Sequence, residues 1–138
     1  MGSGEPVVET VRIEMGGEAS GDLLRSLHAA LAQESQWRGR VGFVEAPRQP
    51  EGLGGLIEAL TVVLAPGGVA AVLVGAVVSW ARHQSVGDVV CKLSRPDGTS
   101  VEVSAPLARS LRGTDEVRAL VEDLARQLEH GSGSSGGA

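Results

Sequence analysis

The chain has 138 residues, 42% apolar and 21% charged, a composition that excludes a disordered protein and fits one domain with its own core. Its net charge of −5 and its three aromatic residues exclude the basic, stacking surface of a nucleic-acid-binding protein. A single cysteine, Cys91, excludes an internal disulfide and predicts a reducing compartment, so we expect a cytoplasmic location.

Three segments differ in composition. Residues 1–6 read as a flexible lead, and residues 130–138 form a Gly/Ser tail of the kind found in linkers. Between them we expect a single α+β domain at 7–129, interrupted by an apolar helical block at 53–83. The lead shows no basic segment followed by an apolar run, so no secretory signal is predicted.

The first half of the chain predicts a strand, a helix and a second strand. From Val7 to Met15 apolar residues alternate with polar ones, with Thr10, Arg12 and Glu14 together on the outer side, which is typical of a half-buried strand. Ser20 or Asp22 can cap the helix that follows. Arg40–Glu45 predicts the second strand. The apolar face of the helix is formed by Leu23, Leu24, Leu27 and Leu31.

After residue 87 the sequence predicts a hairpin and a last helix. The arms of the hairpin are Asp88–Ser94 and Thr99–Ser104, and the turn between them, RPDG, places Pro and Gly where a tight turn needs them. Pro106 is expected to end regular pairing. A helix begins at Thr114 or Asp115. Its apolar stripe consists of Val117, Leu120, Val121, Leu124 and Leu128.

The apolar block contains twenty-three residues without a charge, Ala59–Ala81. One helix of that length would reach roughly 34 Å, enough for a bilayer core of about 30 Å, and Trp80 would lie at the interface. Pro66 and two glycines interrupt it, however, so the alternative is two short helices, Leu53–Leu64 and Gly67–His83, packed as a hairpin on the sheet. Membrane span and protein core both remain open. The side chains concerned are Leu60, Val62, Val63, Leu64, Val72, Leu73, Val77, Val78 and Trp80.

Small residues recur at every fourth position in the second half of this block. Gly67, Ala71, Gly75 and Ser79 would lie along one side of a helix, where small side chains allow two helix backbones to approach closely. We call these four residues the small-residue ladder. We expect it to contact either the first half of the block or another copy of the chain, which would make the protein a homo-oligomer.

The fold class is therefore α+β. We expect a small mixed sheet of about four strands in the order β-α-β, apolar helical block, β-hairpin, α, with two amphipathic helices and a central hydrophobic helix or helical hairpin.

Several phrases along the chain resemble the bacterial effector-associated constant component family. They are VRIEM, RGRVGFVEAPRQPEGLGGLIEAL, the apolar block ending in SWAR, KLSRPDGTSVEVSAP and EVRALVEDLARQLE, which together span roughly Val7 to Glu129. The resemblance implies a constant accessory component of a bacterial conflict (immunity) system, encoded beside interchangeable protease-type effectors. These phrases are structural, and the resemblance implies no catalytic residues.

The sequence offers little catalytic chemistry. Cys91 shares the inward parity of its strand, which favours a buried thiol over a nucleophile served by His83. His28, His83 and His130 lack the spacing of a metal site, and EGLGGL lacks the Lys-Ser/Thr of a phosphate loop. Glu58 is the one acid near the block, and we expect it at a boundary facing water. We predict no enzymatic activity, no cofactor and no metal.

Two functions follow as hypotheses. The first is a non-enzymatic accessory or scaffold protein of a conflict system that acts by self-assembly and associates with the inner membrane through the apolar block. The alternative is a soluble adaptor in which the apolar hairpin forms the core or an oligomer interface. In both, the partner is a protease-type effector and nucleic acid is excluded.

Overall fold

The computed structural model describes residues 9–16, 20–45, 57–64, 70–84 and 88–130, and the lead at 1–6 and the tail from 131 lie outside this part. Five strands form one antiparallel sheet in the order β2-β3-β1-β4-β5. The strands are β1 (Glu9–Met15), β2 (Val41–Glu45), β3 (Ile57–Leu64), β4 (Val90–Ser94) and β5 (Ser100–Ser104). The helices are α1 (Ser20–Ala32), the 3-10 turn η1 (Ser35–Trp37), α2 (Ala70–Arg82), α3 (Ala105–Ser110) and α4 (Thr114–His130).

The α+β class is thus confirmed, and the sheet differs from the expected one in two respects. All its described pairs are antiparallel where a mixed sheet was expected. It also gains a fifth strand, because the first half of the apolar block is not a helix. Ile57–Leu64 is β3, which pairs with β1 on one side and β2 on the other.

The prediction of a helix at Leu53–Leu64 is therefore wrong over the residues that the structure describes. The reason is the composition of the strand. Leu60, Val62 and Leu64 face the helices, and Val63 between them is apolar as well, so the sequence reads as continuous rather than alternating. Only the second half of the block is helical, as α2, and residues 65–69 between the two lie outside the described part.

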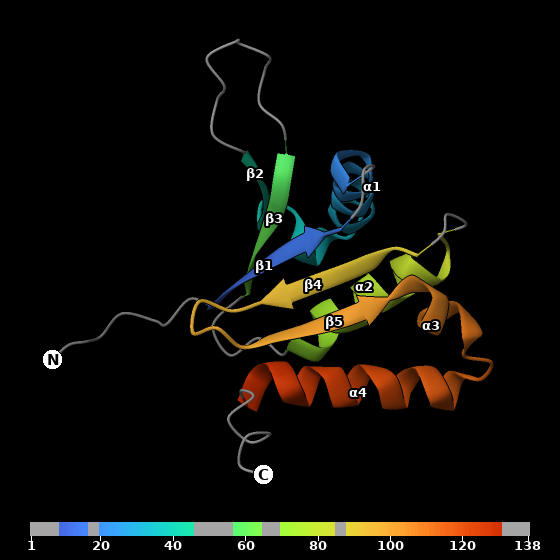
Figure 1. The fold of residues 1–138 in the computed structure, drawn as a ribbon. Coiled ribbons are helices and arrows are strands. Elements are labelled where there is room, and N and C mark those ends of the chain that lie inside the picture. Colours follow the sequence, from blue (N-terminus) through green and yellow to red (C-terminus); the bar gives the residue numbers. More distant parts are fainter. Residues whose placement is uncertain (1–8, 17–19, 46–56, 65–69, 85–87, 131–138) are drawn as a thin grey trace, which may run out of the picture.

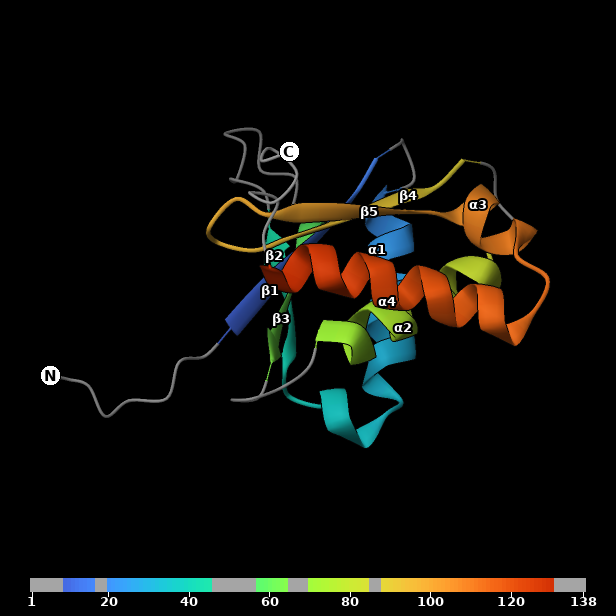
Figure 2. The ribbon, with the colours of Figure 1, turned by 90° about the horizontal axis from the view of Figure 1, so that it is seen from below.

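The helices lie on one side of the sheet. In Figure 1 the strands stand in front of α1 and α2, and α4 runs below β5; Figure 2 shows the same helices from below, gathered beneath β4 and β5. α2 packs between α1 and α4 and lies against β5, while α1 covers β1, β2 and β3. Because helices cover one face, β1, β4 and β5 bury their alternate residues on that face.

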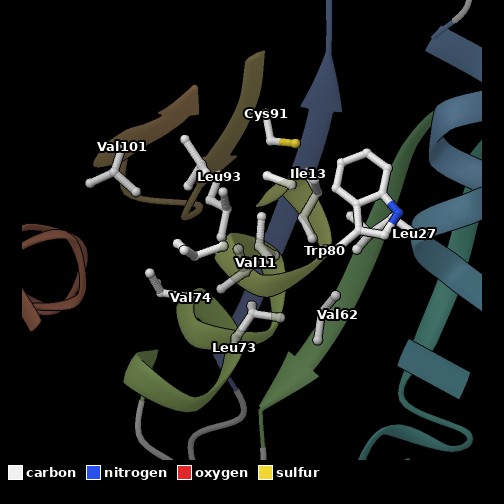
Figure 3. Close-up of a cluster of buried hydrophobic side chains, with 14 of the residues drawn as sticks. Val11, Ile13, Leu27, Val62, Leu73, Val74, Trp80, Cys91, Leu93 and Val101 are labelled. Carbon is white, nitrogen blue, oxygen red and sulfur yellow. The ribbon is translucent and has the colours of Figure 1, made fainter. Parts of the chain in front are cut away.

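The core lies between this helix layer and the sheet. Val11 and Ile13 of β1 are buried there, and β4 adds Cys91 and Leu93. Figure 3 shows side chains of α2 lying against these strands, with Leu27 of α1 beside Trp80. The apolar block supplies a large share of the core. Its fully or nearly fully buried members are Ala59, Leu60, Val62, Leu64, Ala70, Leu73, Val74, Val77, Val78, Trp80 and Ala81.

The hairpin forms as the sequence predicts. The N–H of Arg95 donates to the carbonyl of Thr99 over 2.8 Å, and the N–H of Gly98 donates to the carbonyl of Arg95 over 2.9 Å. Gly98 has a φ of 97°, a conformation that favours glycine. The turn is completed by Asp97, whose carboxylate accepts the N–H of Thr99 over 2.9 Å.

This contact makes the hairpin sensitive to acid. The hydrogen bonds that the carboxylate of Asp97 accepts, above all from the backbone N–H of Thr99, lower its pKa. The pKa of Asp97 is lower in the folded state than in the unfolded state, so its hydrogen bonds contribute fully to stability above the unfolded carboxyl pKa of about 3.9. That contribution is lost as the pH falls through the lower folded value. Thermal unfolding should show Asp97→Asn less stable than wild type at neutral pH, with the difference closing in acid. A constant difference across that range would contradict the titration of Asp97.

A short helix, α3, follows the hairpin where we expected only an interruption by Pro106. Ser104 caps it, because its hydroxyl accepts the N–H of Leu107 over 3.3 Å. Proline is well suited to the first turn of a helix, where its missing N–H would have no partner. Pro106 therefore ends the strand pairing by starting a helix.

Two arginine side chains bind the carbonyls at the C-terminal ends of α3 and α4. Arg82 of α2 donates to the carbonyls of Ala108 and Leu111, both over 3.1 Å, at the end of α3. Arg95 donates to the carbonyls of Leu128 and Glu129 near the end of α4, both over 3.0 Å. These carbonyls lie at helix C-termini, where they have no partner within the helix and where a cation is favoured.

Candidate functional site

None of the helices that the structure describes lies on one face of the sheet, which is the side turned toward the viewer in Figure 1. The residues on it alternate with those of the core, so they are mostly polar. Thr10, Arg12 and Glu14, which the sequence placed together on the outer side of the first strand, all lie on this open face. The neighbouring strands add Thr61, Lys92, Ser94, Ser100 and Glu102.

Arg12 stands at the centre of this face between two carboxylates. Its Nε lies 2.8 Å from Oε2 of Glu14, and its Nη2 lies 3.0 Å from Oε2 of Glu58. The hydrogen bonds to Glu14 and then to Glu58 raise the pKa of Arg12. All three side chains are about two-fifths exposed, and ion pairs in such positions add little to stability. Glu58 faces water, as predicted, and forms an ion pair with Arg12 on this surface.

Beside Arg12 the open face is hollowed. The hollow has a volume of about 270 Å³ and is lined by Thr10, Arg12, Thr61, Ser94, Arg95 and Pro96. The register explains the grouping, because Arg12 is the cross-strand partner of Thr61 in β3 and of Ser94 in β4. The hydroxyls and the two guanidinium groups of the hollow, with the two carboxylates beside Arg12, can exchange hydrogen bonds with a polar partner. These residues include no histidine or thiol that could act as a base or nucleophile.

A second hollow of about 270 Å³ lies between α1 and α2. Trp80 forms part of its wall, and its indole N–H donates to the hydroxyl of Ser26 over 3.0 Å. At the rim, the Nδ1–H of His83 donates to the carbonyl of Ser79 over 2.7 Å. His83 is exposed, one residue beyond the end of α2. The other lining residues are Ala30, Leu31, Glu34 and Ala76.

The remaining histidines and acids do not form a metal site. His28 is half-buried on α1 and stacks on Phe43 of β2, with ring centroids 4.4 Å apart. The side chain of His130 and the segment Glu51–Leu56 lie outside the described residues. Within the part that the structure describes, no three His, Cys, Asp or Glu side chains are grouped so as to hold a metal ion.

Cys91 is a core residue, as its strand parity predicted. Its side chain is fully buried in β4, and burial raises the pKa of the thiol to about 12. At pH 8 only about one molecule in ten thousand would then carry the reactive thiolate. Native protein should therefore resist a thiol reagent at pH 8, while protein unfolded in urea should react at the rate of a free cysteine. Rapid labelling of the folded protein would contradict the buried position.

The small-residue ladder lies on one flank of α2. Ala71 and Gly75 are half-buried, Ser79 is exposed, and Gly67 is outside the described residues. A Cβ added at Gly75 would lie 3.8 Å from Cγ1 of Val121 on α4. The helix that faces Gly75 in the chain is therefore α4. The first half of the block, one of its two expected partners, is a strand instead.

The residues expected to meet either lipid or core lie largely inside the protein. Leu60, Val62, Leu64, Leu73, Val77, Val78 and Trp80 are buried, Val63 is half-buried, and Val72 alone among the nine is exposed, at 46%. None of the helices that the structure describes is long and apolar enough to cross a membrane. A single helical span over Ala59–Ala81 is excluded, because Ile57–Leu64 is a strand of the sheet.

Comparison with curated proteins and with solved structures gives no match. A family model does match, and it covers residues 16–125, from the end of β1 through most of α4. The match includes all four strands that follow β1, namely β2, β3 and the two strands of the hairpin, and all four helices in whole or in large part. Its description is Effector Associated Constant Component 1. Because the model matches well over half of the chain, the chain belongs to the Effector Associated Constant Component 1 family.

Proposed function

We propose that this protein is a non-enzymatic accessory component of a bacterial conflict system, and that the open face of its sheet binds a protease-type effector. The family supports the association with an effector. The resemblance to conflict-system components described from the sequence supports the class of effector. The buried, unreactive position of Cys91 supports a role without covalent chemistry.

The observation that carries the proposal is the uncovered polar face around Arg12. The helices leave it free, and it presents fixed charges and hydroxyls around a hollow of about 270 Å³. Arranged charges of this kind improve the specificity and the speed of protein association more than they stabilise a fold. The face therefore suits a partner with complementary polar groups.

Co-purification with the protease-type effector encoded beside the gene tests this function. Thr61→Arg places a long cation in the hollow, where Thr61 lies across from Arg12. We expect it to weaken effector binding by more than about tenfold, because the long side chain would fill the hollow that a partner group would enter. Thr114→Arg is the matched control, since Thr114 is exposed on α4. Equal binding by both variants, each folded by circular dichroism, would overturn the assignment of this face.

For the apolar block we favour the adaptor alternative, in which the block is core. Its buried side chains support this role, and we assign it no membrane contact. We propose that Gly75 of the small-residue ladder serves the internal contact between α2 and α4, where an added Cβ has 3.8 Å to Val121.

The ladder proposal predicts opposite effects for two substitutions of Gly75. Gly75→Ala should stabilise by about 0.5–1 kcal/mol, because alanine favours helix and its methyl group fits. Gly75→Leu should cost about 1–3 kcal/mol, because the longer side chain must displace Val121. Urea unfolding measures both. If Gly75→Leu left stability unchanged but altered the mass in solution, the ladder would be an outer interface.

A further inference from the structure

The inference concerns β2, the outermost strand on one side of the sheet. Among the described residues its strand neighbour is β3 alone. The carbonyl of Arg40 accepts the N–H of Val63 in β3 over 2.8 Å. Because main-chain groups of an antiparallel strand point alternately to its two sides, those of Val41 and Phe43 point away from β3, to the edge.

This edge lacks two of the features by which proteins usually prevent pairing. VGFVE holds no proline and no lysine, and Phe43 at its centre is 43% exposed. A register shift between Val44 and Glu45 limits the regular edge to Val41–Val44. At the opposite edge of the sheet, α4 packs along β5. Within the described part of the chain, the outer edge of β2 is thus short, apolar and without a strand partner.

We propose that β2 pairs antiparallel with β2 of a second copy, about a two-fold axis at Gly42. In this register Val41 of each copy lies opposite Phe43 of the other. The two-fold axis therefore gives two such pairs, and each pair forms two main-chain hydrogen bonds, four in all. Each is a cross-strand pair of an aromatic and a β-branched residue, which is a favourable combination. The inference is independent of the effector-binding proposal.

Charge complementarity selects a second copy as the partner. Arg38 and Arg40 precede the strand, and Glu45, which is exposed, ends it. In the antiparallel dimer the end of the strand that carries Glu45 in one copy lies beside the end that carries Arg38 and Arg40 in the other. The contact therefore joins opposite charges at both ends of the strand pair. Four hydrogen bonds make a small interface, so the dimer should dissociate on dilution.

Gly42 provides a clean test, because a Cβ added there meets no atom of its own chain within 4 Å. Opposed residues of a pair that is not hydrogen-bonded have Cα atoms about 4.5 Å apart. Gly42→Lys would bring two ammonium groups together across the axis, and we expect it to weaken the dimer by more than about tenfold. Gly16→Lys is the matched control, since Gly16 has the same open surroundings. Light scattering over a range of concentrations gives the mass.

Gly42→Cys gives an independent readout, because a Cα separation of about 4.5 Å permits a disulfide. With a mild oxidant, Gly42→Cys should form a covalent dimer on a non-reducing gel, and Gly16→Cys should not. The buried Cys91 will not compete. The proposal is overturned if the wild-type protein is monomeric at every concentration, or if Gly42→Lys and Gly16→Lys have the same mass in solution. It is also overturned if the chain is monomeric and Gly42→Lys abolishes effector binding, because the edge would then be an effector site.

Discussion

Leu73→Ala should lower the free energy of unfolding by about 2–5 kcal/mol, whereas Val72→Ala, one position earlier in α2, should change it by less than about 0.5 kcal/mol. Leu73 has no exposed surface, so its truncation removes packed methyl groups and leaves a cavity. Val72 is 46% exposed, so its truncation removes contacts mainly with water. Urea denaturation followed by circular dichroism measures both.

The two neighbours form a matched pair within the apolar block. If α2 were surrounded by lipid or by other copies on all sides, the two truncations would have effects of similar size. A large loss for Leu73→Ala alone supports a helix with one face in the core of its own domain. Similar losses for both would contradict the arrangement in Figure 3.

Arg95→Ala should cost about 2–4 kcal/mol, the second large effect that we expect. Only a fifth of its side chain is exposed. The guanidinium serves two carbonyls near the end of α4 and lies 3.1 Å from the carboxylate of Glu9 in β1. Its removal deprives the part-buried carbonyl of Leu128 of this donor and removes the side-chain link between the hairpin turn and the last helix.

Two further variants separate geometry from charge. Arg95→Lys keeps the charge but loses the planar fork that reaches several oxygens at once, so its effect should be intermediate. Arg126→Ala is the control, because its ion pair with Asp123, at 3.4 Å, has both side chains more than half exposed and should contribute little. Equal effects for Arg95→Ala and Arg126→Ala would contradict the role of Arg95 as a link between elements. Thermal unfolding compares all three.

Alternation of apolar and polar residues predicted four of the strands close to their observed positions, because each has one face on the helices and one exposed. It failed for β3, where Ala59, Leu60, Val62 and Leu64 are all buried. Length and composition could have identified this strand. Its eight residues end just before Pro66 and include the β-branched run Thr61, Val62 and Val63.

The candidate site could be predicted only in part. The pattern of β1 placed Thr10, Arg12 and Glu14 on the outer side, and the sequence marked Glu58 as facing water. It could not bring Glu58 to Arg12, because that contact depends on β3 being the neighbour of β1. The roles of Arg82 and Arg95 were missed for a similar reason, since a helix end within reach of a distant arginine is a property of packing.

The central position of β1 has a consequence for how the protein folds. β1 comes before all other strands of the sheet, yet its partners are β3 and β4, as in the pairs Val11 with Val62 and Ile13 with Leu93. Contacts so distant in sequence slow folding, because a long loop must close before they form. Until β4 has been made, at least one side of β1 has no partner. During synthesis or refolding this strand is therefore the segment most open to pairing with other chains, and the yield of refolding should fall as protein concentration rises.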